Sequence, residues 1–362
     1  MNAPVVERPA TAEELAARLR DAADARLAVM PVGGGRASAM GDPPERIDVE
    51  LHTSRLDRVV EHSPADMVVS VESGITLEAL QAELAKSGQF LPLDPFNSPG
   101  HSIGGLLASG WTGPLRQRFG SPRDFVIGMR VALPDGRVAS AGGRVVKNVS
   151  GYDMIKLHLG AMGSLGVIVA VSFKVFPKAL HDVTVEVSRG SIDEAWAATD
   201  RALALPMAPA ALELFSSGRV LARFLGSRDA VNRMVAELGW SEADTSVWAE
   251  HSSKAPESWA RLAVPPHKLR STVLALPAGA VWWASPGVGV VNWSIETGSE
   301  TVREARASAE SAGGSLVLMA APVDIRREVG AWGTRPPTLA LMQRLKTAFD
   351  PQQVMNPGRF VV

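Results

Sequence analysis

A run of glycines follows a short apolar segment near the start of the chain. Residues 27–30 predict a buried strand, and the loop PVGGGR (residues 31–36) comes directly after it. Backbone that lacks a β-carbon can approach a bound group closely, and successive N–H groups can hold a phosphate. The loop matches the dinucleotide-binding pattern GxGxxG only in part, and the Gly-Lys-Ser/Thr of a P-loop does not occur. A surface turn without a ligand is the alternative.

Further glycine-rich segments favour the binding interpretation. Residues 91–120 mix Gly, Pro and Ser with apolar residues, which predicts a long ordered loop wrapped on a ligand, and residues 160–166 (GAMGSLG) precede a strand. Residues 101–180 carry ten Lys and Arg against three Asp, a net charge of +7 in a nearly neutral chain. These features predict an anion site; a solvated basic face or a docking patch for an acidic partner would carry the same charge.

The composition limits the function classes. The 362 residues are 46% hydrophobic and 21% charged, as in folded globular proteins, and suffice for two domains. The net charge of −1 offers no overall field for nucleic acid, so we expect none as a partner. Cysteine is absent, which excludes disulfides, zinc–thiolate sites, thiol nucleophiles and thiolate-ligated iron–sulfur clusters. Redox chemistry in this chain would therefore need a borrowed cofactor.

Two segments bear on location. The first residues, MNAPVVERPATAEEL, do not follow the pattern of a secretory signal, which predicts a cytoplasmic protein. Residues 271–295 carry no charge and are long enough to cross a bilayer. Prolines and glycines divide them into short pieces, however, so we predict buried strands joined by turns and no membrane span.

The elements that must position the glycine loops can be read from periodicity and turn signals. Thr11 and Glu14 form a capping box before a helix, and Thr76 begins an amphipathic helix with Leu77, Leu80 and Leu84 on one face. Helices are also expected over residues 192–205, 228–238 and 339–349. Strands are expected over residues 27–30, 47–51, 56–61, 67–71, 125–133, 137–139 and 167–176. This alternation predicts an α/β or α+β domain.

The composition changes near residue 180. Eight of the nine tryptophans lie after it, whereas the glycine loops lie before it. We therefore predict a ligand-binding domain over residues 1–180, a second domain of mixed strands and helices over 181–335, and a C-terminal segment, 336–362, that returns to the first domain.

The order of these motifs is that of a known family. The succession PVGGGR, VESGITL, LDPFNSPGHSIGGLLASG, FGSPRDFVIGMRVALPDGRV, VKNVSGYDMIKLHLGAMGSLGVI and FDPQQVMNPGRF resembles the FAD-binding oxidoreductases of the vanillyl-alcohol oxidase (PCMH) type. Within that family the chain is most similar to the smaller FAD-binding subunits of bacterial glycolate oxidases. The resemblance implies an α+β fold, with an FAD-binding domain of two α/β subdomains and an antiparallel-sheet cap.

The resemblance also implies which residues contact the cofactor. The first loop would face the pyrophosphate, the second would run past the pyrophosphate and the isoalloxazine ring, and the third would lie at the adenine and ribose. The first set is Val32, Gly33, Gly34, Gly35, Arg36, Ala37 and Ser38. The second is Asp94, Pro95, His101, Ser102, Ile103, Gly104, Gly105, Ser109 and Gly110, and the third is Gly160, Gly163, Ser164, Gly166, Val167 and Ile168.

The positions of the histidines bear on two questions, covalent attachment of the flavin and a metal site in the cap. Some relatives bond the flavin covalently through a histidine, and His101 lies in a suspected flavin loop; we expect non-covalent FAD, because a polar loop residue suffices there. Larger relatives hold a metal in the cap with paired histidines and a carboxylate. After residue 180 this chain has only His181, His251 and His267, at no close spacing, so we predict surface or packing roles for them and no metal site.

The resemblance implies oxidation of a small 2-hydroxy acid, glycolate to glyoxylate, with hydride transfer to the flavin. The candidate catalytic residues are Asn356, Arg359, Arg116 and Tyr152, the only tyrosine. Without cysteine, an iron–sulfur relay must lie in a partner, and the resemblance implies two partners, a larger catalytic flavoprotein and an iron–sulfur subunit, with membrane association only through that complex. The alternatives are a self-sufficient flavin dehydrogenase or oxidase of another hydroxy acid or alcohol, and a non-catalytic scaffold subunit.

Overall fold

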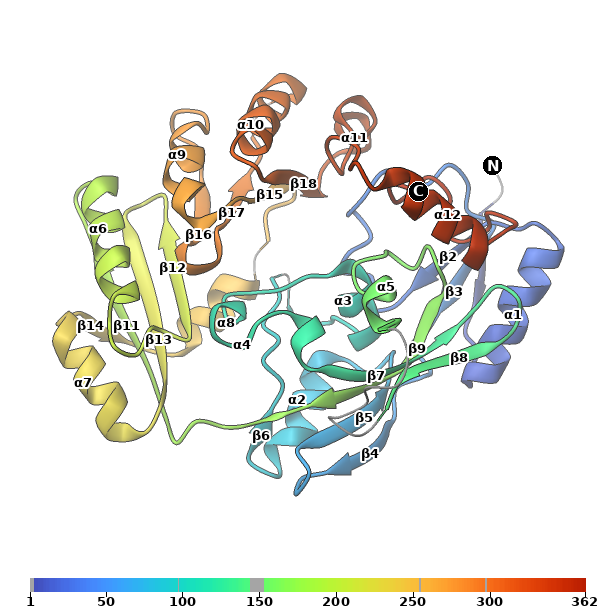
Figure 1. The fold of residues 1–362 in the computed structure, drawn as a ribbon, viewed down its shortest axis with the longest axis horizontal. Helices are drawn as coiled ribbons and strands as arrows, with labels where there is room; N and C mark the ends of the chain where they lie inside the picture. Colours follow the sequence, from blue (N-terminus) through green and yellow to red (C-terminus); the bar gives the residue numbers. More distant parts are fainter. Residues whose placement is uncertain (1–2, 97, 144–152, 254, 297) are drawn as a thin grey trace.

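A computed structural model describes residues 3–96, 98–143, 153–253, 255–296 and 298–362. Three β-sheets organise these residues, and a two-stranded ribbon of β6 (Gln89–Phe90) and β10 (Phe176–Pro177) accompanies them. The first two sheets and their helices form the N-terminal region, and the third sheet forms the cap (Figure 1). Within the described residues, no helix is long and apolar enough to cross a membrane.

The N-terminal region begins with a small parallel sheet in the order β1-β3-β2. Its strands are β1 (Val5–Glu7), β2 (Val29–Val32) and β3 (Val49–His52). Helix α1 (Ala12–Asp24) packs Leu15 and Leu19 onto this sheet, and both side chains are completely buried. The Thr11 hydroxyl accepts the N–H of Glu14, as predicted, whereas the Glu14 carboxylate accepts the N–H of Ala10. The helix therefore starts where the sequence indicates.

A five-stranded antiparallel sheet, β4-β5-β9-β7-β8, completes the N-terminal region. Its strands are β4 (Val59–Ser63), β5 (Val68–Glu72), β7 (Val126–Ala132), β8 (Val138–Gly142) and β9 (Val167–Lys174). Helices α2 (Leu77–Ala85) and α5 (Ile155–His158) and the short helix η1 (Pro122–Asp124) lie on the connections. The strand expected over 56–61 begins only at Val59, because Leu56 closes a turn on the carbonyl of Thr53.

The long loop predicted over residues 91–120 is partly helical, which corrects the prediction. Helix α3 (Ile103–Ser109) starts at Ser102, whose hydroxyl accepts the N–H of Gly105, and ends at Gly110 in the left-handed conformation. A second short helix, α4 (Arg116–Phe119), follows. Because glycine is a poor helix former, the sequence does not predict α3. Its Gly104 is needed for packing, because a β-carbon there would lie 2.8 Å from the β-carbon of Ser73.

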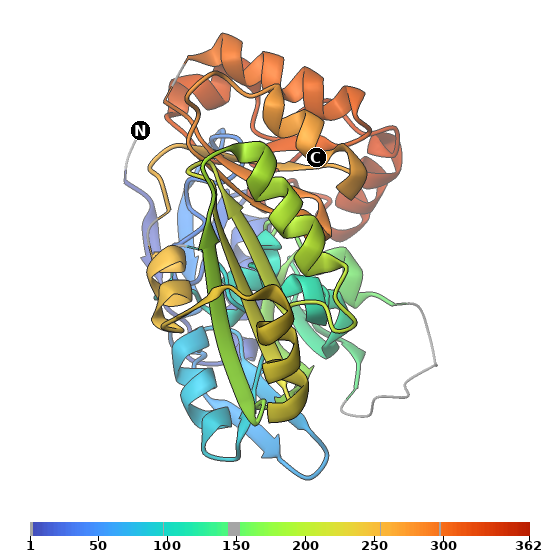
Figure 2. The same ribbon diagram turned by 90° about the vertical axis from the view of Figure 1, so that its left-hand side faces the viewer.

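The cap is an eight-stranded antiparallel sheet in the order β14-β11-β13-β12-β16-β17-β15-β18. Its strands are β11 (His181–Ser188), β12 (Ala211–Phe215), β13 (Arg219–Gly226), β14 (Ser241–Ala243), β15 (Trp259–Ala263), β16 (Trp282–Ser285), β17 (Val290–Ser294) and β18 (Ser315–Ala320). Helices α6 (Ile192–Leu203), α7 (Arg228–Leu238), α9 (Leu269–Leu274) and α10 (Ser299–Ser311) cover one face (Figure 2). The segment 271–295 contains strands β16 and β17, as predicted, but its first piece belongs to helix α9.

The last helices connect the cap back to the N-terminal region. After α11 (Val323–Val329), helix α12 (Leu339–Phe349) lies beside the N-terminal sheets (Figure 1). Val29 of β2 donates to the carbonyl of Val354 and accepts the N–H of Asn356. Helix α8 (Ser246–Ser253) and the short helices η2 (Pro266–Lys268) and η3 (Pro286–Val288) complete the cap.

Candidate cofactor site

Two adjoining cavities form one groove between strand β2, helix α3 and the loop 160–168. They share residues of β2, of the glycine loop and of α3. Most of the residues predicted to contact the cofactor line this groove: Val32, Gly33, Gly34, Gly35, Arg36, Ala37, Ser38, His101, Ser102, Gly104, Gly105, Ser109, Gly163, Gly166, Val167 and Ile168. The structure thus gathers segments far apart in the sequence along one surface.

The glycine loop passes so close to the segment before α3 that side chains have no room. A β-carbon on Gly33 would lie 2.1 Å from the Ser102 hydroxyl oxygen, and one on Gly34 would lie 1.9 Å from the carbonyl oxygen of Gly100. The hydroxyl of Ser102 accepts the N–H of Gly34 at 3.0 Å and ties the two segments together. The floor of the groove is therefore made of backbone.

The same loop offers hydrogen-bond donors to a ligand. Within the part of the chain that the structure describes, the N–H groups of Gly35, Arg36 and Ala37 donate to no protein acceptor. Backbone N–H groups in a glycine-rich turn bind phosphate oxygens without needing a side-chain cation. The arrangement therefore suits an anion such as a pyrophosphate, as the sequence predicts.

Arg359 lines the groove and holds the far end of the glycine loop. Its guanidinium donates to the carbonyls of Ala37 at 2.6 Å, Ser38 at 3.2 Å and Met40 at 3.3 Å. Burial, and the charge of nearby Arg326, lower the pKa of Arg359 to about 10, so it stays protonated at neutral pH. These contacts support a positioning role for Arg359.

Replacing this arginine should weaken cofactor binding without unfolding the chain. We expect Arg359→Ala to raise the dissociation constant for FAD by about tenfold or more, because three carbonyls lose a charged donor and the loop loses its anchor. Flavin fluorescence titration of the apoprotein measures the constant. Arg335→Ala, at an exposed arginine, is the control and should leave it unchanged. Equal affinities in both variants would contradict the positioning role.

The C-terminal segment also braces the third glycine loop. Lys346 of α12 donates to the carbonyl of Ser164 at 2.8 Å, and the side-chain amide of Asn356 donates to the carbonyl of Met162. The Oδ1 atom of Asn356 is buried and has no partner among the described residues. An unpaired buried acceptor beside this loop is what a ligand donor would satisfy.

His158 is a groove residue that the sequence reasoning missed. It ends helix α5, is buried, and packs edge-on against Phe349 with 5.8 Å between ring centres. Burial lowers the pKa of His158 to about 4, so the imidazole is neutral at physiological pH. The residue stands within the motif VKNVSGYDMIKLHLG, and that position was the available signal. The other lining residues missed are Met30, Pro31, Thr53, Ala108, Ala161 and Met162.

The depressed pKa of His158 predicts acid sensitivity. Below about pH 6.5 the unfolded chain binds a proton that the folded chain refuses until about pH 4, so stability falls across this window as pH decreases. When the pH is lowered from 7 to 4.5, we expect the free energy of unfolding of His158→Leu to decrease by about 2 kcal/mol less than that of the wild type. Urea denaturation at both pH values measures the difference. Parallel losses in the two proteins would contradict the assigned burial effect.

Several predicted residues lie elsewhere. Asp94 accepts the N–H of Leu115 at 2.9 Å, and burial raises the pKa of its carboxyl to about 8. Arg116 is exposed on α4, and Tyr152 lies outside the described residues. His101, by contrast, does line the groove, and its Nε2 atom lies 2.8 Å from the carbonyl oxygen of Phe96. The remaining predicted cofactor residues outside the groove lining are Pro95, Ile103, Gly110, Gly160 and Ser164.

Among the residues that the structure describes, no group of three or more His, Cys, Asp or Glu side chains is placed to hold a metal ion. The three cap histidines lie apart from one another: His181 is on β11, His251 on α8 and His267 in η2.

A backbone cradle with free N–H donors in an α+β fold is the kind of site that holds the phosphates of a nucleotide cofactor. Comparison with known proteins identifies the nucleotide. Residues 3–142 match the model of the FAD binding domain, and residues 327–360 match that of the C-terminal domain of FAD linked oxidases. The chain is similar over these domains to the FAD-binding oxidoreductases of the vanillyl-alcohol oxidase (PCMH) type, and the matches are consistent with that family. It is thus an FAD-dependent oxidoreductase, as the motifs imply.

Individual relatives agree with this assignment. The chain is 28% identical to glycolate oxidase subunit GlcE of Escherichia coli, over 87% of each chain. It is 35% identical to a mitochondrial D-lactate dehydrogenase [cytochrome] of Arabidopsis thaliana, over 49% of this chain and 31% of that one. Among solved structures, an alkyldihydroxyacetonephosphate synthase shares the fold with a TM-score of 0.73 at 17% identity, covering 99% of this chain and 78% of that one.

Proposed function

We propose that this chain is the FAD-carrying subunit of a complex that oxidises glycolate to glyoxylate and passes the electrons to a partner. The observation that carries the proposal is the similarity to glycolate oxidase subunit GlcE, which extends through the N-terminal region and the cap and covers most of both proteins. The D-lactate dehydrogenase named above matches over less than half of its own length. We retain the division into residues 1–180, 181–335 and 336–362, which the separate sheets and the returning helix α12 support.

The residues of the groove fit the cofactor. The unpaired N–H groups of Gly35, Arg36 and Ala37 would bind the pyrophosphate, and Arg359 would keep their loop in place. When bound, FAD supplies a two-electron acceptor for the carbon of an alcohol donor. The unpaired Oδ1 atom of Asn356 would accept a hydrogen bond at the ligand's edge, while its side-chain amide N–H donates to the carbonyl of Met162. Arg116 and Tyr152 remain candidates for the donor side.

An iron–sulfur relay for onward electron transfer would lie in a second chain. This sequence has no cysteine, and iron–sulfur clusters are held mainly by cysteine thiolates. We therefore assign the relay to an iron–sulfur subunit, and a second substrate-oxidising flavin to a larger flavoprotein subunit. A cytoplasmic location, with membrane contact only through these partners, is part of the same proposal.

The visible spectrum of the purified chain tests this function. We expect a yellow protein whose flavin stays oxidised when glycolate is added anaerobically, and bleaches once the larger flavoprotein subunit is also present. Bleaching by glycolate in the isolated chain would instead show a self-sufficient dehydrogenase. A colourless protein after dialysis against excess FAD would overturn the proposal in favour of a scaffold subunit.

A further inference from the structure

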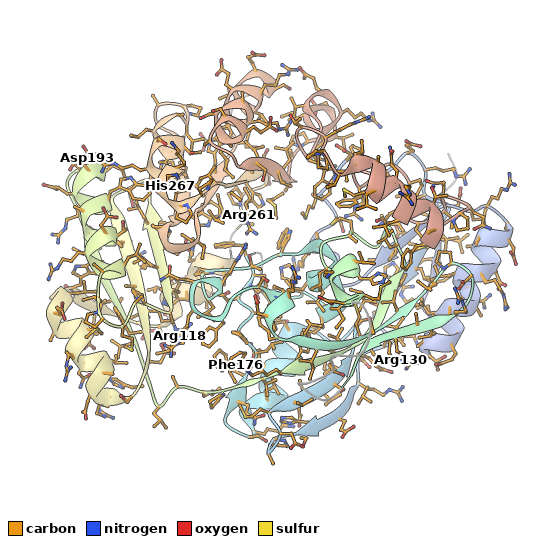
Figure 3. All side chains as sticks on the ribbon, viewed as in Figure 1. Arg118, Arg130, Phe176, Asp193, Arg261 and His267 are labelled. Carbon is orange, nitrogen blue, oxygen red and sulfur yellow. The ribbon has the colours of Figure 1, made fainter. Side chains whose placement is uncertain are left out.

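A separate cavity, with a volume of about 420 Å³, lies where the N-terminal region, the segment that joins the two regions and the cap meet. Its walls come from helix α2 and the residues that follow it, from residues 178–179, and from strands β11 and β13. It shares no lining residue with the two cavities of the cofactor groove. Arg118, on the side of this junction shown in Figure 3, donates to the carbonyl of Leu225 in the cavity wall. A cavity of this size can enclose a small organic molecule.

Part of the cavity wall is apolar. Leu93 and Leu115 of the N-terminal region and Leu225 of the cap line it, and all three are buried residues. Phe90 also lines the cavity, and its ring packs edge-on against Phe119 with 5.5 Å between ring centres. These side chains would shield the apolar body of a ligand from water.

The cavity also contains cationic groups. The guanidinium of Arg223 donates to both carboxylate oxygens of Asp182, at 2.9 and 2.6 Å, and its Nη1 atom has no partner in the described chain. Lys178 lines the cavity too, and no carboxylate among the described residues lies within ion-pair distance of its ammonium. Because the charges of Arg223 and Asp182 cancel, Lys178 leaves one net positive charge. The charge balance therefore favours a monoanion.

Asp94 adds a hydrogen-bond donor at neutral pH. Its Oδ2 atom accepts the N–H of Leu115 at 2.9 Å, and its Oδ1 atom has no partner in another described residue. Burial raises the pKa of Asp94 to about 8, and the Glu213 carboxylate adds to the rise, whereas the Leu115 N–H and the charge of Arg223 oppose it. The carboxyl group is therefore protonated at pH 7, and its O–H can donate to a ligand oxygen.

We propose that this cavity binds an organic monocarboxylate with an apolar body. Arg223 and Lys178 attract the carboxylate, Asp94 donates a hydrogen bond to it, and Phe90 and the leucines enclose the apolar body. The inference goes beyond the proposed function, because no step of glycolate oxidation requires this cavity. Since the walls come from both regions, a bound ligand would stabilise the contact between the cap and the N-terminal region.

Isothermal titration of the FAD-loaded chain with hexanoate at pH 7 tests this site. We expect hexanoate to bind at least about tenfold more tightly than acetate, which has the carboxylate but lacks the apolar chain. It should also bind at least about tenfold more tightly than 1-hexanol and hexylamine, which have the chain but no negative charge. An excess of glycolate should leave the affinity for hexanoate unchanged, because glycolate has no apolar body.

Arginine variants on strand β13 test the cation. Arg223→Met should weaken hexanoate binding by about tenfold or more, because it removes the guanidinium and leaves the Asp182 carboxylate unpaired in the cavity. Arg219→Met is the matched control. Arg219 lies four residues earlier on the same strand and forms an ion pair with Glu186 at 2.6 Å, but it does not line the cavity. Its replacement should leave the affinity for hexanoate unchanged.

The pH dependence of binding tests Asp94. From pH 7 to pH 9 the affinity of the wild type for hexanoate should fall by up to about tenfold, because the ionised Asp94 repels the ligand carboxylate and no longer donates to it. Asp94→Asn stays neutral and keeps a donor, so its affinity should be the same at both pH values.

Three results would overturn the inference. The first is that hexanoate does not bind, or binds no better than 1-hexanol. The second is that glycolate displaces hexanoate while Arg223→Met binds it normally, which would place the acid elsewhere. The third is an equal fall in affinity with pH in Asp94→Asn and the wild type. Circular dichroism and FAD content show that each variant is folded. A wild-type chain that does not retain FAD contradicts the proposed function, and hexanoate binding to that chain still decides this inference.

Discussion

Gly34→Ala is expected to weaken FAD binding severely. The added β-carbon would lie 1.9 Å from the carbonyl oxygen of Gly100 and 2.9 Å from the backbone nitrogen of Ser102. Both contacts are with backbone, so the glycine loop must move away from the segment that leads into α3. The Gly34 N–H then loses the Ser102 hydroxyl, and the unpaired N–H groups leave their places. We expect the dissociation constant for FAD to rise by at least about a hundredfold, equivalent to about 3 kcal/mol.

Alanine variants at two further glycines distinguish lack of room for a β-carbon from backbone strain. Gly35 has φ +73° but open room, with the nearest atom 3.8 Å from an added β-carbon, so Gly35→Ala should cost only about 1 kcal/mol of backbone strain. Gly190 has neither constraint and Gly190→Ala should be neutral. Flavin fluorescence titration ranks the three variants. A Gly34→Ala protein that binds FAD like the wild type would show that this loop does not form the cofactor floor.

Asp350→Ala should destabilise the whole chain by about 3–5 kcal/mol, because it leaves a buried lysine without its counter-ion. The Asp350 carboxylate lies 2.7 Å from the ammonium of Lys346, and both side chains are almost completely buried. It also accepts the N–H groups of Val354 and Met355. Burial already lowers the pKa of Lys346, so the lone ammonium would be poorly tolerated. Urea unfolding followed by tryptophan fluorescence measures the loss.

An exposed pair provides the comparison for Asp350. Glu300 and Arg303 lie three residues apart on α10 with 2.8 Å between them, and Glu300 is 77% exposed. Glu300→Ala should cost less than about 0.5 kcal/mol, because water solvates both charges. Because Lys346 also holds Ser164 of the third glycine loop, Asp350→Ala should weaken FAD binding as well. Equal stabilities of the two variants would mean that the pair does not anchor the C-terminal segment.

Local sequence signals predicted much of the fold. The capping residues Thr11 and Thr76 begin helices as predicted, and the alternating strands and the terminal helix lie close to their expected ranges. These elements could be predicted because capping, hydrophobic periodicity and turn chemistry act over a few residues. Helix α3 could not be predicted, because its two glycines contradict helix propensity. A β-carbon would lie 2.8 Å from the β-carbon of Ser73 at Gly104 and 3.0 Å from the Ser102 hydroxyl oxygen at Gly105, and these contacts arise only in the tertiary structure.

For the site, the sequence by itself determined three features: glycine loops with available N–H groups, the absence of cysteine, and motifs shared with FAD-binding oxidoreductases. Only the tertiary structure decided which residues come into contact. Arg359 reaches the loop at Ala37 across more than 300 positions of sequence, and His251 meets Glu213 through packing between a helix and a strand of the cap. Such contacts depend on how sheets and helices pack against one another, and the spacing of neighbouring residues in the sequence does not determine that packing.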